Sequence, residues 1–253
     1  MNIVILAGGF GTRLSEYTEV IPKPMVEIGK TPMLMHIINL YTKYKYDTFY
    51  VALGYKSKFI IDYFNTIGVI QSREDDNKIT YSLLFNEKKI SVNLIETGLE
   101  TMTGGRLKRI SKYIKNDRFM VTYGDGLADI NINDLEKFHL SHGKIATITA
   151  VQPPARFGSL IMDGNKVLEF REKSKLDESW INGGFFILEP EFLEYIDDDN
   201  TFLEREPLEE ISKLNELMAF KHKGFWQCMD TKRDRDALQK LYIDGDLDVF
   251  IRK

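Results

Sequence analysis

Hydrophobic and polar residues follow two patterns along the chain, short apolar runs and longer segments with helical spacing. Four short apolar runs predict strands buried on both faces: Ile3–Ala7, Thr48–Gly54, Arg118–Gly124 and Ile145–Val151. Apolar residues recur at helical spacing in four longer segments: 31–46, 56–65, 104–114 and 132–143. In the last segment Asn133 is the expected cap and Gly143 the expected end. This alternation predicts an α/β fold whose mainly parallel sheet is covered by helices.

Two stretches depart from this pattern. Residues Gln71–Val92 alternate polar and apolar side chains, which predicts an exposed β excursion, and we interpret it as a contact surface between subunits. Residues Pro153–Leu188 are again β-rich, with turns predicted at Gly158 and within 162–166. After Glu189 the helical pattern returns.

Three glycines, Gly8, Gly9 and Gly11, follow the first predicted strand, and Arg13 and Lys23 come soon after. Ligands of parallel sheets collect at the carboxyl ends of strands, where these glycines fall. Backbone amides of such a loop can face a polyphosphate, while the guanidinium and the ammonium, held between two prolines, neutralise it. The loop is therefore predicted to be a phosphate cradle, with a tight turn that binds no ligand as the alternative.

Two familiar glycine motifs do not fit this loop. A P-loop needs Lys followed by Ser or Thr after the second glycine, and the chain has Thr12 and Arg13 there. A dinucleotide fold needs a third glycine where Leu14 stands, and the acidic residue at the right distance, Glu27, lies in a turn. An NAD-dependent oxidoreductase is therefore disfavoured.

Composition narrows the class of protein further. The 253 residues are 43% hydrophobic and carry a net charge of −4, so neither nucleic acid nor a membrane surface is an expected partner. One cysteine, Cys228, excludes an internal disulfide, and no basic leader precedes the first strand. A cytoplasmic protein is expected. No repeat or Ser/Pro-rich linker divides the chain, so residues 1–253 are predicted to form one domain.

Several motifs resemble those of sugar-phosphate nucleotidyltransferases. "LAGGFGTRL" followed by "PKPM" is similar to the signature of that family. Further segments resemble one branch, the glucose-1-phosphate cytidylyltransferases, in the same order and spacing from about residue 2 to 242. These segments are "LGYK" (53–56), "ETGLETMTGGRLKR" (96–109), "TYGDGLADIN" (122–131), "PPARFGSL" (153–160), "FREK" (170–173), "INGGFF" (181–186) and "GFWQCMDT" (224–231).

The resemblance implies a fold and a reaction. The fold is a Rossmann-like, mainly parallel twisted sheet flanked by helices. Residues from about 1 to 130 form its nucleotide-binding half, and those from about 131 to 253 form a β-rich acceptor-binding half. The reaction is Mg²⁺-dependent attack of a small phosphorylated acceptor on the α-phosphorus of CTP, which gives a CDP-linked product and pyrophosphate. The resemblance also implies a homo-oligomer.

Site residues carry over by position. Arg13 and Lys23 become the catalytic cations, while Asp125 and Asp230 become the Mg²⁺ ligands. The implied nucleotide-binding residues are Leu6, Ala7, Gly8, Gly9, Gly11, Thr12, Arg13, Lys23, Thr101, Thr103, Gly104, Arg106 and Gly124. The implied acceptor-binding residues are Tyr123, Glu172, Lys173, Asn182 and Gly183.

Two departures from the family pattern concern the acceptor. Ser174 stands where a proline usually follows the Glu-Lys pair, and residues 86–94 lack the usual Trp-containing basic segment. The acceptor is therefore left open between glucose 1-phosphate, a related sugar phosphate and a non-sugar phosphate such as phosphoglutamine. A nucleotide sensor without catalysis is disfavoured because every expected charged residue is present.

The remaining reactive side chains are interpreted as structural. Cys228 is expected to pack, since phosphoryl chemistry needs no thiol nucleophile. The four histidines show no metal-ligand spacing: His36, His139, His142 and His222.

Overall fold

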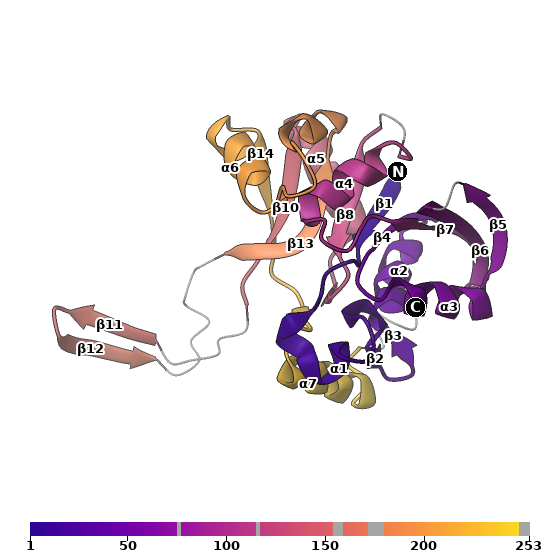
Figure 1. The fold of residues 1–253 in the computed structure, drawn as a ribbon. Coiled ribbons are helices and arrows are strands. Elements are labelled where there is room, and N and C mark those ends of the chain that lie inside the picture. The colour runs from indigo at the N-terminus through magenta and orange to yellow at the C-terminus, as the bar shows by residue number, and fades with distance from the viewer. Residues whose placement is uncertain (75–76, 115–116, 154–158, 172–179, 248–253) are drawn as a thin grey trace.

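The computed structural model describes residues 1–74, 77–114, 117–153, 159–171 and 180–247. Nine strands within these residues form one sheet (Figure 1). They are β1 (Asn2–Leu6), β4 (Thr48–Leu53), β5 (Val69–Glu74), β6 (Lys78–Phe85), β7 (Lys88–Glu96), β8 (Phe119–Tyr123), β10 (Ala146–Val151), β13 (Ile181–Leu188) and β14 (Leu217–His222). Their order is β14-β10-β13-β8-β1-β4-β7-β6-β5.

The centre of this sheet is parallel, as the sequence predicted. Strand β1 pairs in parallel with β4 and β8, and β4 pairs in parallel with β7. Strand β13 runs antiparallel between β8 and β10, and β6 runs antiparallel to both β7 and β5. The four parallel strands therefore end at one common edge, which is where the glycine loop begins.

Helices cover both faces of the sheet. The described helices are α1 (Ser15–Thr18), α2 (Met33–Lys43), α3 (Ser57–Ile67), α4 (Thr103–Ser111), α5 (Ile132–His142), α6 (Glu206–Lys213) and α7 (Lys232–Ile243). They agree with the four helices expected from periodicity and with the helical pattern after Glu189. None of them combines the length and the apolar character that a bilayer crossing requires.

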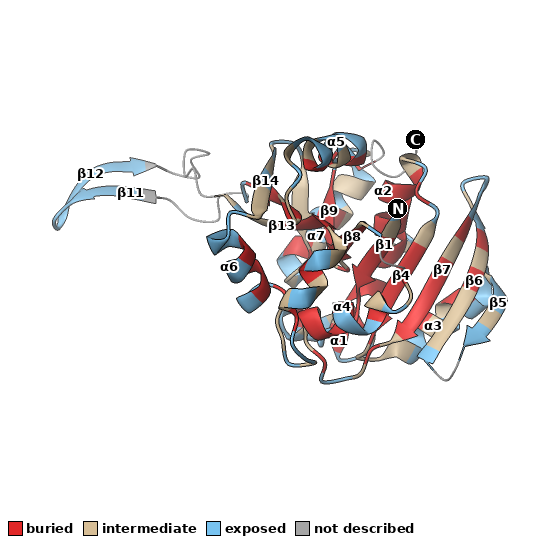
Figure 2. Cartoon of the chain, turned by 90° about the horizontal axis from the view of Figure 1, so that it is seen from above, coloured by how far each residue is buried: buried red, intermediate tan, exposed pale blue. Residues whose placement is uncertain are grey.

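Alternate residues of the central strands enter two separate cores. In β1, Ile3 and Ile5 pack with residues of α2 and α3, while Val4 and Leu6 pack with residues of α4 and α6. All four side chains are buried, and Figure 2 shows the same for most of β4. The continuous apolar run in the sequence follows from this burial on both faces.

The predicted exposed β excursion at Gln71–Val92 is confirmed as β structure and is exposed at β5 and at residues 86–89, but its strands belong to the main sheet. Strand β7 lies inside the sheet as the parallel neighbour of β4, and β6 pairs along its whole length with β7. Tyr81 and Val92 are fully buried, and only β5 at the edge of the sheet is exposed along most of its length. The polar–apolar alternation arises because one face of these strands packs against a helix. Sequence alone did not distinguish such strands from an excursion outside the sheet.

The predicted cap of α5 is displaced by two residues. The side chain of Asn131 accepts hydrogen bonds from the amides of Asn133 and Asp134, so Asn131 is the cap and Asn133 lies inside the first turn. Gly143 ends the helix in a left-handed conformation, as predicted. Two asparagines at i and i+2 are equally good candidates by type, and the position of the first apolar residue decides between them.

Three two-stranded sheets complete the described residues: β2 (Glu27–Ile28) with β3 (Thr31–Pro32), β9 (Gly126–Ala128) with β15 (Trp226–Cys228), and β11 (Ser159–Asp163) with β12 (Lys166–Arg171). The last pair is a hairpin that projects away from the body of the molecule in both views (Figures 1 and 2). It confirms the predicted β character and the turn within 162–166, whereas the turn predicted at Gly158 lies outside the described residues.

Candidate active site

The glycine loop, residues 7–12, leads from β1 into a 3₁₀ turn, η1 (Thr12–Leu14). Gly11 has a φ of +64°, a left-handed conformation that residues with a side chain rarely adopt. Its carbonyl accepts a hydrogen bond from Thr18 Oγ1 at 3.0 Å. The sharp turn is thus held by a side chain of the following helix, and it leaves the loop open at the carboxyl edge of the sheet.

Arg106 braces this loop from behind. A side chain at Gly8 would overlap with the Arg106 guanidinium, whose Nη2 donates to the Gly8 carbonyl at 3.0 Å. The other acceptors of the guanidinium are Leu53 O, Thr97 Oγ1, Gly98 O and Leu99 O. Arg106 was expected to bind the nucleotide. Arg106 lines the cavity, but its donors hold the Gly8 carbonyl of the loop and acceptors at the ends of β4 and β7.

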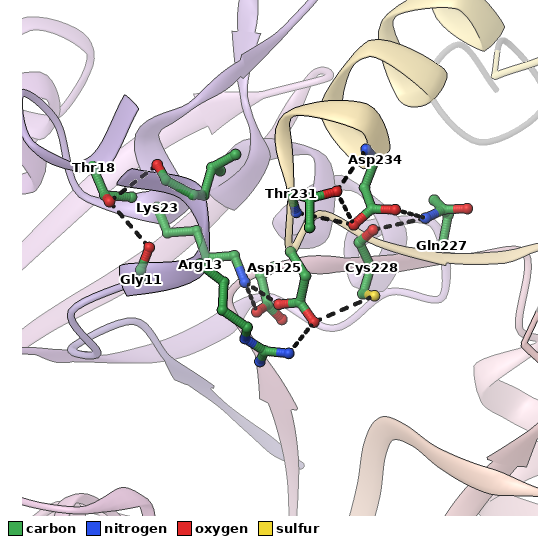
Figure 3. A network of polar contacts seen from close by, with 11 residues as sticks. Gly11, Arg13, Thr18, Lys23, Asp125, Gln227, Cys228, Thr231 and Asp234 are labelled. Atoms are coloured by element: carbon green, nitrogen blue, oxygen red, sulfur yellow. Dashed lines mark hydrogen bonds and ion pairs between the residues drawn. The ribbon is translucent and has the colours of Figure 1, made fainter. Parts of the chain in front are cut away.

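Lys23 joins the two predicted metal ligands. Its Nζ lies 2.5 Å from Asp125 Oδ2 and 2.6 Å from Asp230 Oδ1 (Figure 3). Lys23 begins η2 (Lys23–Met25), with Pro22 in extended backbone before it, and it is 8% exposed. Residues separated by more than 200 positions therefore meet at one ammonium group. Their convergence was predicted from the motifs, whereas the lysine between them was not.

The short sheet of β9 and β15 brings the two aspartates together. Gly126 of β9 lies opposite Cys228 of β15, and the Met229 amide donates to the Asp125 carbonyl at 2.8 Å. Asp230 follows directly and precedes Thr231, whose side chain caps α7 in a capping box. The carboxylates are thus fixed by backbone pairing on one side and by a helix start on the other.

The charges of this cluster support one another. Burial opposes the charged form of Lys23, but the two carboxylates outweigh it, so the pKa of Lys23 is raised. Arg13 adds a second cation, with Nη1 at 2.8 Å from Asp230 Oδ2, and its side chain is 74% exposed. Lys23 is a fixed internal cation, whereas Arg13 reaches from the loop into the open cavity.

The donor set of the cluster fits a hard divalent cation. Two carboxylates lie together on either side of the Lys23 ammonium, and such ions bind through carboxylate and phosphate oxygens. Across the described ranges no group of three or more His, Cys, Asp or Glu side chains converges as a metal site. The protein would therefore supply two carboxylate ligands, Asp125 and Asp230, and the remaining ligands would come from water or substrate.

A cavity of about 410 Å³ opens in front of the loop and the charge cluster. It is lined by most of the residues predicted to bind nucleotide: Leu6, Ala7, Gly8, Gly9, Gly11, Thr12, Arg13, Lys23, Thr101, Thr103, Arg106 and Gly124. Gly104 has a different environment, since its amide donates to the Thr201 carbonyl at 3.0 Å behind the cavity wall. Asp125 and Tyr123 also line the cavity.

The far wall of the cavity contains a residue that the sequence did not reveal. Tyr123 Oη donates to Glu204 Oε1 at 2.7 Å, and Asn182 Nδ2 donates to Tyr123 Oη at 3.0 Å. Glu204 lines the cavity together with Phe202. The segment "TFLEREPLEE" that contains Glu204 has four acidic residues, and no signal in it distinguishes this one.

The other predicted acceptor residues fall outside the lining. Gly183 lies behind the wall, where its carbonyl accepts from Trp226 Nε1 at 2.8 Å. Glu172 and Lys173 lie outside the residues that the structure describes. Of the predicted acceptor residues that the structure describes, Tyr123 alone lines the cavity, and Asn182 is connected to it through the hydrogen bond to Tyr123 Oη.

Histidine and cysteine side chains have structural environments, as expected. His36 bonds the Ile28 carbonyl at 2.9 Å, and His139 bonds Thr147 Oγ1 at 2.7 Å. Burial, together with the charges of the nearby aspartates, raises the pKa of Cys228 to about 11. A thiol with such a pKa is a poor nucleophile at neutral pH.

Comparison with known proteins gives consistent matches. The family described as nucleotidyl transferase matches residues 2–234. Glucose-1-phosphate cytidylyltransferase of Salmonella typhimurium is 47% identical over 249 residues, which covers 97% of both chains. Probable glucose-1-phosphate cytidylyltransferase of Bacillus subtilis is 37% identical over 253 residues with the same coverage. Among solved structures, HddC from Yersinia pseudotuberculosis superimposes with a TM-score of 0.69 at 26% identity and covers 95% of this chain and 99% of HddC.

Replacing Lys23 by methionine should destabilise the protein. Asp125 and Asp230 would then face each other without the cation between them, at a cost of about 2 kcal/mol in the free energy of unfolding, because the carboxylates remain partly exposed. Urea unfolding measures this loss. The double variant K23M/D230N should recover part of it, and Lys30→Met, at an exposed position in the turn after β2, should have almost no effect. Equal losses for Lys23 and Lys30 would contradict the assignment.

Proposed function

The chain belongs to the nucleotidyl transferase family, and we propose that it transfers the cytidylyl group of CTP to glucose 1-phosphate and releases pyrophosphate. The observation that supports the reaction type is the convergence of the glycine loop, Arg13, Lys23 and Asp125 on one cavity, with Asp230 paired to both cations. The choice of cytosine and of glucose 1-phosphate rests on the names of the relatives that are 47% and 37% identical.

The proposed reaction joins two anions. A phosphate oxygen of the acceptor attacks the α-phosphorus of CTP and forms a new P–O bond. The bond from that phosphorus to the oxygen that bridges to the β-phosphate breaks, and pyrophosphate leaves with its electron pair. The chief obstacles are charge repulsion and alignment, because little proton transfer is needed. Fixed cations on a rigid loop address both.

Each part of the cluster has a proposed task in this reaction. Backbone amides of the glycine loop face the triphosphate, and the exposed guanidinium of Arg13 reaches it from the rim. Asp125 and Asp230 would hold Mg²⁺, which supplies positive charge at the reacting phosphates when bound. Lys23 holds the two carboxylates in place and contributes a second positive charge beside them.

The two substrates are proposed to occupy different walls. The base and ribose lie along the wall of Thr101 and Thr103, and the acceptor lies against Tyr123 and Asn182. Lys173 remains the proposed contact of the acceptor phosphate, on the strength of the motif resemblance.

A substrate screen tests the function directly. The purified protein with Mg²⁺ should release pyrophosphate from CTP and glucose 1-phosphate faster than from the other three nucleoside triphosphates. The acceptor panel should include phosphoglutamine, because the departures from the family pattern at Ser174 and residues 86–94 left a non-sugar acceptor open. Binding of CTP without turnover on any phosphorylated acceptor would contradict the proposal and favour a nucleotide sensor.

Neutralising either metal ligand should slow catalysis. Asp125→Asn and Asp230→Asn are each expected to lower kcat at least about 100-fold, because an electrostatic contact at the reacting phosphates is lost. Steady-state pyrophosphate release measures kcat, and urea unfolding checks that the variants are folded. Asp62→Asn, at an exposed position of α3, is the matched control. Near-normal kcat in both variants would exclude these residues as metal ligands.

We propose further that copies of the chain associate through the β11–β12 hairpin. Two cross-strand pairs of this hairpin are apolar, Leu160 with Phe170 and Met162 with Val167, and each of the four side chains is at least 47% exposed. A two-stranded hairpin with such side chains in water is marginally stable on its own. The apolar pairs carry no charge, so two copies related by a two-fold axis can pack them against each other.

The oligomer proposal predicts which substitutions dissociate the assembly. Leu160→Asp with Phe170→Asp should reduce the molar mass measured by light scattering, because charges then enter the apolar contact. Leu84→Asp should leave the mass unchanged. Leu84 is 80% exposed on β6, within the region that the sequence analysis interpreted as the subunit contact. Dissociation by the Leu84 substitution alone would reverse the assignment.

A further inference from the structure

The Glu204 carboxylate bridges two hydroxyl groups on the wall of the cavity. Tyr123 Oη donates to its Oε1 at 2.7 Å, and Thr103 Oγ1 donates to its Oε2 at 2.6 Å. Tyr123 ends β8 and Thr103 begins α4, so one acidic side chain ties together the strand and the helix that border the acceptor and nucleotide walls.

Two glycines of α4 allow Glu204 to reach this position. Side chains at Gly104 and Gly105 would collide with the backbone of Thr201 and Asp199. Without them, both glycine amides donate to the Thr201 carbonyl, at 3.0 and 3.3 Å. The segment before Glu204 therefore lies directly on the first turn of α4, and the double glycine in the sequence serves this contact.

The direction of each hydroxyl proton follows from the carboxylate. An ionised carboxylate only accepts hydrogen bonds, and a hydroxyl has one proton to give. Tyr123 and Thr103 each donate their one hydroxyl proton to Glu204, so toward any further partner their oxygens can only accept a hydrogen bond. They already accept from Asn182 Nδ2 at 3.0 Å and from the Leu203 amide at 2.9 Å, respectively.

Burial and the nearby charge of Glu204 keep the Tyr123 hydroxyl protonated. Burial is the larger cause and the Glu204 carboxylate the next, and both raise the pKa of Tyr123. The phenol therefore remains a donor to Glu204 at every pH at which the protein would be assayed. The wall presents lone pairs and one negative charge, opposite in character to the cationic rim at Arg13.

We propose that Glu204 determines acceptor specificity by making this wall accept hydrogen bonds and repel anions. A ligand group that fits such a wall is neutral and donates, as sugar hydroxyls do, whereas a carboxylate is excluded. The inference rests on the proposed function and deepens it, because it selects a phosphorylated polyol over an acceptor that carries a carboxylate, such as phosphoglutamine. Glu204 thus positions Tyr123 and Thr103 and sets the charge of the acceptor wall.

The test compares two acceptors that differ in one charged group. Glucose 1-phosphate and glucuronic acid 1-phosphate are identical except for the carboxylate at C6. Glu204→Gln keeps the shape of the side chain but removes the charge and replaces one acceptor oxygen by an NH₂ donor. The hydroxyl of Tyr123 or Thr103 that faces this NH₂ group must then accept a hydrogen bond and direct its own proton elsewhere. The preference for glucose 1-phosphate, as a ratio of kcat/KM values, should fall at least about tenfold, and the KM for glucose 1-phosphate should rise about tenfold. The KM for CTP should rise less than the KM for glucose 1-phosphate, since the variant alters only the Thr103 contact on the nucleotide wall and leaves the phosphate contacts untouched.

Control variants separate a specific effect from a structural one. Glu210→Gln, at an exposed position of α6, makes the same charge change away from the wall and should leave the preference unaltered. Tyr123→Phe combined with Glu204→Gln should be less damaging than the two effects added, because both act through one hydrogen bond. A preference unchanged in Glu204→Gln, or an equal rise in both KM values, would overturn the inference. Failure of the proposed function is distinct, since the unmodified protein would then turn over neither acceptor.

Discussion

The ammonium group of Lys23 is the interaction on which the site depends. It binds both Asp125 and Asp230, which come from segments about 100 and 200 positions further along the chain, and Arg13 supplies the second positive charge. Two carboxylates at this distance repel each other strongly in a partly buried site, and they remain together because a cation lies between them. The same two carboxylates are the proposed ligands of the divalent cation, so stability and metal affinity would depend on the same atoms.

Opposite charges then divide the cavity into two regions. Arg13 and the glycine loop form a cationic rim suited to phosphates, and Glu204 forms an anionic wall suited to hydroxyl groups. A sugar phosphate carries both chemistries in one small molecule, so it can contact both regions at once. Arg106 belongs to neither region, because its guanidinium donates to the carbonyls of Gly8 in the loop and Leu53 at the end of β4.

Glycines occur at two close contacts within the protein because a side chain at these positions would not fit. Gly8 admits the guanidinium of Arg106, and the pair Gly104 and Gly105 admits the segment that leads to Glu204. In each case another part of the chain occupies the volume that a Cβ would fill. The conspicuous glycine motifs therefore report close approach of protein to protein, as well as the approach of a ligand to the open loop.

The sequence by itself determined the strand–helix alternation, the parallel centre of the sheet and most of the cavity lining, because apolar periodicity and short motifs are local properties. Tertiary structure decided that β7 lies inside the sheet and that Glu204 faces Tyr123. Burial and long-range hydrogen bonds depend on which distant segments meet, and sequence alone does not distinguish Glu204 from the other glutamates beside it. Lys23 illustrates both kinds of information. Its motif was recognisable in the sequence, whereas its position between two carboxylates became known only from the fold.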